Sequence, residues 1–230
     1  MTTEAFLNNV PTYSPAERDR RWNLARKFME AENLDALLVF GEHEDAGPGP
    51  AAFDMWFTNH RPGTTVIFPR TGEPISLFPM PLYIMDHLES TRRGDSVWIP
   101  PRNVRSTRDS STVVATLKEL NLAQGRVGVV GLEASPPWHP EGIIPHQFWD
   151  RMLKGLPDIE FKPVDHAMTR IVMPQSREEI AVVRHTAAIG DAMVRAMVDK
   201  AAVGISESEV YAAGMAAGYA RGAIPSAMVS

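Results

Sequence analysis

The segment from Phe53 to Thr64 gathers aromatic, amide, imidazole and guanidinium side chains just before an apolar run. Arg61 could bind a carboxylate through its planar set of donors, with Trp56 as an apolar wall and His60 beside them. An aromatic pair in the core with solvated polar neighbours explains the same residues. The sequence favours this second interpretation and leaves a substrate-binding role for Trp56, His60 and Arg61 open.

Two other groups combine histidine with carboxylates, which are common ligands of divalent metals. Residues 42–45 read Glu-His-Glu-Asp, and a second group contains His139, Glu141 and His146. A single loop seldom fixes the geometry of a metal site, and Pro140 prevents a helical arrangement of the second group. We therefore interpret both groups as loops, and we predict neither a catalytic residue nor a metal ligand among them.

Several classes of function are disfavoured by composition and by missing motifs. The sequence has no Gly-x-Ser-x-Gly elbow, no phosphate-binding loop and no His-Glu-x-x-His pair. A net charge of −5 argues against nucleic-acid binding, and no stretch is long enough to cross a bilayer. The absence of cysteine and of a signal-peptide pattern predicts a cytoplasmic protein.

The elements that must position these residues alternate between helix and strand. Ser14 and Pro15 predict a helix over residues 14–33, and an apolar run predicts a strand buried on both faces at residues 35–41. Two apolar runs around a glycine turn predict a hairpin over residues 64–79. Further helices are predicted at residues 82–92, 111–122 and 145–153, and further strands at residues 96–99, 126–131 and 160–164. This order predicts an α/β fold with a mixed β-sheet flanked by helices.

A second region follows a short connection. We place an α/β domain at residues 1–164, a linker at residues 165–175, and the first helices of another domain at residues 176–230. Ser176 with Glu179 has the spacing of a capping box, which predicts the start of a long helix. One broad apolar face is predicted on that helix, formed by Ile180, Val183, Ala187, Gly190, Val194, Met197 and Ala201.

The helix after it has features of its own. Ser206 with Glu209 forms a second capping-box pattern, after the stop that Gly204 supplies. Gly214, Gly218 and Gly222 recur every four residues, which predicts close packing against another helix or a sheet.

Several motifs resemble those of the creatinase, prolidase and Xaa-Pro aminopeptidase family. They include the opening helix with Ala-Glu-Arg-Asp-Arg-Arg-Trp at residues 16–22, the apolar strand after it, and the hairpin after Arg61-Pro-Gly. The most specific is Arg-Ile-Val-Met-Pro-Gln-Ser-Arg-Glu-Glu-Ile at residues 170–180, although the family usually has a lysine near Met173. The sequence Gly-Ile-Ser-Glu-Ser-Glu-Val at residues 204–210 resembles the turn between the first two helices of the family's pita-bread catalytic domain.

The resemblance implies an N-terminal α/β domain followed by the beginning of a truncated pita-bread domain. In that family the metal-binding Asp, Asp, His, Glu and Glu come after the point at which this sequence ends, so none can be assigned to a residue here. The implied full-length parent is a homodimeric hydrolase with a divalent metal pair (Mn, Co or Zn), cleaving a C–N bond in an Xaa-Pro peptide or a small amidino or amide compound. Trp56, His60 and Arg61 would then contribute to a neighbouring subunit's site. We expect the isolated chain to be inactive; the alternative is a freestanding binding or dimerisation module.

Overall fold

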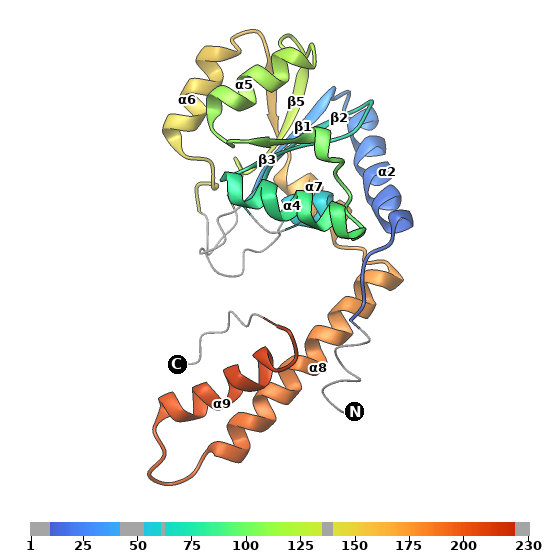
Figure 1. Cartoon of the computed structure of the whole chain (residues 1–230). Coiled ribbons are helices and arrows are strands. Elements are labelled where there is room, and N and C mark those ends of the chain that lie inside the picture. The colour runs from blue at the N-terminus through green and yellow to red at the C-terminus, as the bar shows by residue number, and fades with distance from the viewer. Residues whose placement is uncertain (1–9, 42–52, 61–62, 135–139, 224–230) are drawn as a thin grey trace. The chain divides into compact units, whose positions relative to one another are not determined.

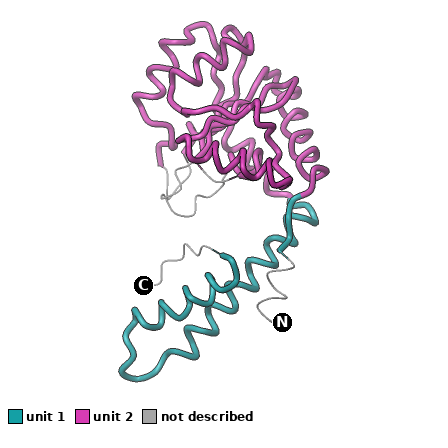
Figure 2. The backbone as a smooth tube through the Cα atoms, in the orientation of Figure 1, with its two compact units in different colours: residues 1–13, 175–230 teal, residues 14–174 magenta. Residues whose placement is uncertain are grey.

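The structure is a computed structural model that describes residues 10–41, 53–60, 63–134 and 140–223. It divides into two compact units, which are drawn in different colours in Figure 2. One unit is Ser14–Pro174, and the other combines Met1–Tyr13 with Gln175–Ser230.

The larger unit is built on a six-stranded mixed sheet with the strand order β4-β3-β2-β1-β5-β6. The strands are β1 (Ala36–Phe40), β2 (Thr65–Pro69), β3 (Ile75–Phe78), β4 (Val104–Ser106), β5 (Arg126–Val130) and β6 (Glu160–Pro163). Strand β2 is antiparallel to both β1 and β3, whereas the β3–β4, β1–β5 and β5–β6 pairs are parallel. All strands except β2 therefore point in the same direction, and their carboxyl ends meet at one edge of the sheet.

Helices cover both faces of this sheet (Figure 1). The helical elements of the unit are α2 (Pro15–Ala31), α3 (Phe53–Thr58), α4 (Pro81–Arg93), η1 (Pro101–Asn103), α5 (Ser110–Glu119), α6 (His146–Gly155) and α7 (Asp165–Val172). Leu38 belongs to a core with Leu117 of α5 and Met152 of α6, while Trp22 of α2 packs edge-on against Phe68 with ring centroids 5.9 Å apart. Burial on both faces explains why β1 is a continuous apolar run, and it confirms the predicted α/β fold.

Local signals in the sequence account for most element boundaries. The Ser14 side chain accepts a hydrogen bond from the Glu17 amide at 3.2 Å, which caps α2 as expected. The predicted hairpin is confirmed, because Val66 pairs with Ser76 in an antiparallel register.

The predicted strand at residues 96–99 is wrong. Trp98 and Ile99 are buried, yet the strand that pairs with β3 is β4, beginning at Val104. Pro100 and Pro101 lack amide hydrogens and cannot extend a ladder, and the Ile99 carbonyl is bound by His87 at 2.8 Å. The apolar character of the segment therefore reflects its place in the core and not a strand.

In the other unit, α8 (Arg177–Lys200) is followed by α9 (Glu207–Tyr219), and both predicted capping boxes are present. The two helices pack closely because Gly214 has no side chain. A Cβ atom there would lie 2.2 Å from Cε and 2.8 Å from Cγ of Met197. The predicted close approach at the glycine stripe is confirmed at Gly214, and Gly218 is buried as well. Gly222, the third residue of the predicted stripe, is exposed and follows the end of α9.

The residues of α8 that are buried in the structure differ from the apolar face predicted for this helix. The buried apolar residues of α8 are Ile189 and Met193, and neither belongs to the predicted face, whereas Ile180, Val183 and Val194 of that face are exposed, so the predicted face is wrong. The helix pair thus leaves part of the apolar stripe uncovered within its own unit. No helix in the described ranges combines the length and the apolar character that a bilayer span requires.

Candidate functional site

Trp56 lies in α3, the short helix that precedes β2, and packs inside the larger unit. Its side chain is 9% exposed, and its ring contacts that of Phe57 edge-on with centroids 5.0 Å apart. The Arg21 guanidinium lies 5.7 Å from the Trp56 ring and 5.1 Å from the Trp98 ring. Trp56 therefore has the packing expected of a core aromatic residue, and its carbonyl accepts a hydrogen bond from Arg21 at 3.2 Å.

Helix α2 fixes the position of α3 through a buried polar network. Arg21 pairs with Glu17 at 2.8 Å, and both side chains are only 3% exposed. Arg20 binds the same carboxylate at 2.7 Å, which leaves Glu17 well compensated in a desolvated position. The indole of Trp22 donates a hydrogen bond to the Phe57 carbonyl at 2.9 Å. Two backbone carbonyls of α3 are thus held by side chains of α2.

His60 follows α3 and reaches a different environment. Its ring centroid lies 4.8 Å from that of Phe78 and 5.5 Å from that of His87. It borders a polar cavity of about 430 Å³, which is lined by Asn59, His60, Asp86, Glu89, Ser90 and Arg93. Arg61, the third residue predicted for the site, lies outside the described residues. The structure therefore places Trp56 in the core and His60 at a polar cavity.

His87 beside it is buried in α4. Its Nε2 atom lies 2.8 Å from the Ile99 carbonyl, so Nε2 carries the proton and donates the bond. Burial lowers the pKa of His87, and the hydrogen bond to Ile99 opposes that shift. A neutral imidazole with Nδ1 as an acceptor follows from these contacts.

A second group of polar residues lies at the carboxyl edge of the sheet. Asp54 of α3 is 1% exposed, and its Oδ2 atom accepts a hydrogen bond from the Thr64 amide at 3.0 Å. Burial raises the pKa of Asp54 to about 6. Gly41 follows β1 in the same place, and a Cβ atom there would lie 2.2 Å from the Thr64 carbonyl oxygen. Only glycine fits this close approach between the end of β1 and the start of β2.

Arg108 is the third residue of this group at the carboxyl edge of the sheet. It follows β4 and donates a hydrogen bond from Nη1 to the Gly41 carbonyl at 2.8 Å. Its guanidinium lies 5.3 Å from the centre of the Phe40 ring. Burial lowers the pKa of Arg108, and the nearby Asp54 carboxyl group opposes the shift.

The sequence interpretation missed Arg108 and Asp54. Arg108 follows a strand that was predicted in the wrong place, so its position at the carboxyl edge could not be anticipated. Asp54 stands within the segment singled out from the sequence, but a pattern does not reveal that its carboxyl group is buried. A correct prediction of β4 from the sequence would have placed Arg108 at the carboxyl edge of the sheet.

The histidine and carboxylate groups weighed as metal sites are only partly described. Residues 42–45 and His139 lie outside the described residues, whereas Glu141 and His146 lie within them. In the described part of the chain, no group of three or more histidine, aspartate or glutamate side chains could hold a metal ion.

Comparison with protein-family models and with curated protein sequences finds no match. Solved structures do match. The prolidase from Pyrococcus horikoshii OT3 is 18% identical with a TM-score of 0.59, over 87% of this chain and 48% of the prolidase. The X-Pro aminopeptidase from Thermotoga maritima MSB8 is 13% identical with a TM-score of 0.64, over 87% of this chain and 49% of that protein.

A dipeptidase from Mycobacterium ulcerans is similar at 17% identity and a TM-score of 0.56, over 91% of this chain and 51% of the dipeptidase. This chain therefore spans about half the length of the solved structures that it resembles. At these identities the likeness shows the fold, and the larger unit has the α/β architecture of the N-terminal domain of such peptidases. It leaves the reaction of this chain to be proposed.

Proposed function

We propose that these residues form the N-terminal portion of a metal-dependent hydrolase that cleaves a C–N bond in an Xaa-Pro peptide or in a small amidino or amide compound. The observation that supports this proposal is the structural likeness to a prolidase and an X-Pro aminopeptidase over about half of each. A cytoplasmic location accompanies the proposal, because a chain without cysteine suits a reducing compartment.

In such an enzyme a pair of Mn, Co or Zn ions would activate a water molecule and polarise the scissile carbonyl group. The described residues do not fit a metal pair, because none of their histidine and carboxylate side chains gather in a group of three. We therefore assign no step of the hydrolysis to them. The pita-bread domain that α8 and α9 would begin is the proposed location of the metal ligands.

The isolated chain is accordingly expected to be inactive. The test is to incubate the purified 230-residue chain with an Xaa-Pro dipeptide and Mn²⁺, Co²⁺ or Zn²⁺ and to measure the release of proline. Release no faster than in buffer with the same metal agrees with the expected inactivity of the isolated chain. Metal-dependent release that a chelator abolishes would refute that expectation and would mean that the chain binds its own catalytic metal.

We further propose that the parent protein is a homodimer in which Trp56, His60 and Arg61 contribute to the neighbouring subunit's site. The border position of His60 at a polar cavity supports its part in this role, and the buried network of α2 would hold the preceding helix in place. In the product of the native gene, His60→Ala should raise the KM for an Xaa-Pro dipeptide more than it lowers kcat. The exposed His166 provides a matched histidine control, and His166→Ala should leave both constants unchanged.

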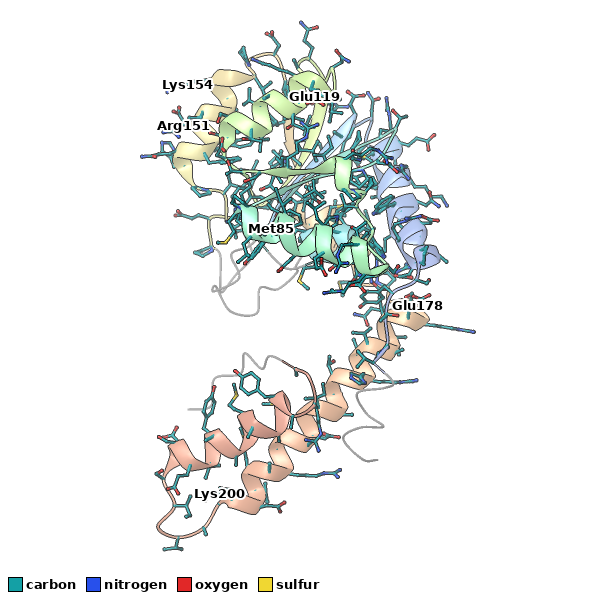
Figure 3. All side chains as sticks on the ribbon, viewed as in Figure 1. Met85, Glu119, Arg151, Lys154, Glu178 and Lys200 are labelled. Carbon is teal, nitrogen blue, oxygen red and sulfur yellow. The ribbon has the colours of Figure 1, made fainter. Side chains whose placement is uncertain are left out.

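A freestanding binding or dimerisation module is the second candidate, and uncovered apolar residues favour it. Val198 is 67% exposed on α8, and Met85 is 65% exposed on α4, where its side chain is visible in Figure 3. Exposed apolar groups of this kind are typical of protein contact surfaces when they gather in a patch. The molar mass of the chain in solution tests this candidate, because a stable monomer at high concentration would count against self-association.

A further inference from the structure

At the carboxyl edge of the larger unit's sheet, the Arg108 guanidinium is held by a backbone carbonyl group and has no carboxylate partner among the described residues. Open α/β sheets bind ligands outside the carboxyl ends of their strands, beside the strand where the chain direction across the sheet reverses. In this sheet the chain proceeds from β1 outward to β4 and then returns to place β5 beside β1. Gly41 lies directly after β1, and Arg108, which follows β4, donates a hydrogen bond to its carbonyl group.

The contacts of Arg108 orient its guanidinium. The Nη1 atom is engaged by the Gly41 carbonyl at 2.8 Å, and the Phe40 ring lies 5.3 Å from the guanidinium carbon. The opposite edge of a guanidinium, formed by Nε and Nη2, is the pair of parallel donors that binds a carboxylate in a bidentate manner. Among the described residues, no acceptor takes a hydrogen bond from that edge of Arg108 and no carboxylate forms an ion pair with it.

Two carboxylates near Arg108, both in the described part of the chain, are engaged elsewhere or are buried. The Asp109 carboxylate caps α5 and accepts hydrogen bonds from the amide and the hydroxyl of Thr112, both at 3.0 Å. Asp54 is 1% exposed, and it binds the Thr64 amide through Oδ2. Its Oδ1 atom is buried and has no hydrogen-bond partner among the described residues. A half-buried arginine and a buried acid thus lie in one region, and among the described residues each has hydrogen-bonding capacity left.

We propose that Arg108 binds the carboxylate of a small organic acid at this edge of the sheet, with Asp54 as the neighbouring group that sets the affinity. The proposal goes beyond the hydrolase function and does not depend on it. A singly charged ligand fits best, because one guanidinium balances one negative charge. A phosphate dianion would face the Asp54 carboxyl group without a second cation among the described residues that contact this region, and the Asp109 carboxylate already caps the N-terminus of α5.

The experiment is a calorimetric titration of the 230-residue chain with sodium acetate at constant ionic strength, with sodium chloride as the reference anion. We expect the wild-type protein to bind acetate and Arg108→Gln to bind it about tenfold more weakly or worse, as loss of a charge-assisted hydrogen bond would cause. Equal acetate binding by the wild-type protein and Arg108→Gln would overturn the proposal, as would no binding to the wild type. Tighter binding of inorganic phosphate than of acetate would overturn the choice of ligand.

Asp54 supplies a second, independent readout. Among the described residues, the titratable groups that influence Arg108 are Asp54 and Tyr83. Because Asp54 takes up a proton near pH 6, acetate should bind severalfold more tightly at pH 5.5 than at pH 7.5. Asp54→Asn should bind tightly at both pH values, and an unchanged pH dependence in that variant would contradict the role of Asp54.

Arg108→Lys is a control for the possibility that Arg108→Gln loses acetate binding only because it does not fold. A lysine keeps the positive charge but lacks the pair of parallel donors, so this variant should fold as the wild type does and lose most of the acetate affinity. Wild-type affinity in Arg108→Lys would refute the bidentate geometry. Circular dichroism of each variant shows whether lost binding accompanies a folded protein.

Discussion

Replacing Arg21 by methionine should destabilise the larger unit strongly, because its guanidinium is buried among partners that cannot reach water. The side chain is 3% exposed, pairs with Glu17 at 2.8 Å and lies within 6 Å of the centres of the Trp56 and Trp98 rings. Breaking a buried ion pair costs about 3–5 kcal/mol, and each desolvated cation–π contact contributes about 1–2 kcal/mol.

The expected decrease in the free energy of unfolding lies near the lower end of the range given for a buried ion pair. Arg20 still binds the Glu17 carboxylate at 2.7 Å in the variant, so the buried charge keeps one partner. Methionine also fills part of the volume between the two indole rings. We therefore predict a decrease of about 3 kcal/mol in the free energy of unfolding, which corresponds to about 1 M in the urea midpoint at a slope of about 3 kcal/mol per M.

Urea denaturation followed by tryptophan fluorescence measures this change, since Trp56 and Trp98 flank the substituted residue. The matched control is Arg92→Met, which removes an arginine from an ion pair with Glu89 on the exposed face of α4. Solvent screens that pair, so the control should leave the midpoint unchanged. Equal midpoints for Arg21→Met and Arg92→Met would refute the reasoning from burial.

Three further predictions concern titration and helix packing. The raised pKa of Asp54, moved from 3.8 to about 6, means that the folded state binds its proton more tightly. The protonated Asp54 therefore contributes about 3 kcal/mol to the free energy of unfolding below pH 4, and this contribution is lost as the pH rises through 6. Urea denaturation at several pH values should show this loss in the wild-type protein and not in Asp54→Asn. Burial lowers the pKa of His87, so stability is lost as pH falls below 6.5, and the same assay should give a shallower loss for His87→Gln. The added methyl group of Gly190→Ala has no neighbouring atom within 4 Å, so this variant should gain up to about 1 kcal/mol of helix propensity and show slower hydrogen exchange in α8. The added methyl group of Gly214→Ala collides with Met197, so this variant should show faster hydrogen exchange in α9.

Much of the fold could be predicted from local signals. Ser14 and the two later capping boxes mark helix starts through contacts within a few residues, and those contacts are present in the structure. The buried run of β1 is equally direct, because a strand covered on both faces needs apolar side chains throughout.

The wrong and missing sequence predictions concern residues whose structure depends on tertiary contacts. Trp98 and Ile99 have the composition of a strand, but the two following prolines and the bond from His87 place them in irregular backbone. The Arg108 site joins residues 67 positions apart, and no spacing rule connects them. Burial of Asp54 likewise depends on the pairing of β1 with β2, which brings Gly41 and Thr64 together.

The apolar stripe of α8 illustrates a different limit. Its periodicity predicts a face that includes Val183 and Val194, yet both are exposed and Ile189 is buried. A sequence pattern shows which side chains are apolar, whereas the covering element depends on the rest of the fold.

The central claim is that these residues are the N-terminal portion of a longer hydrolase. The most direct measurement is the intact mass of the protein made from its native gene, compared with 25.4 kDa for the 230 residues. The account predicts a product substantially heavier than this value. A mass near 25.4 kDa would contradict the claim and would leave the freestanding binding or dimerisation module as the better proposal.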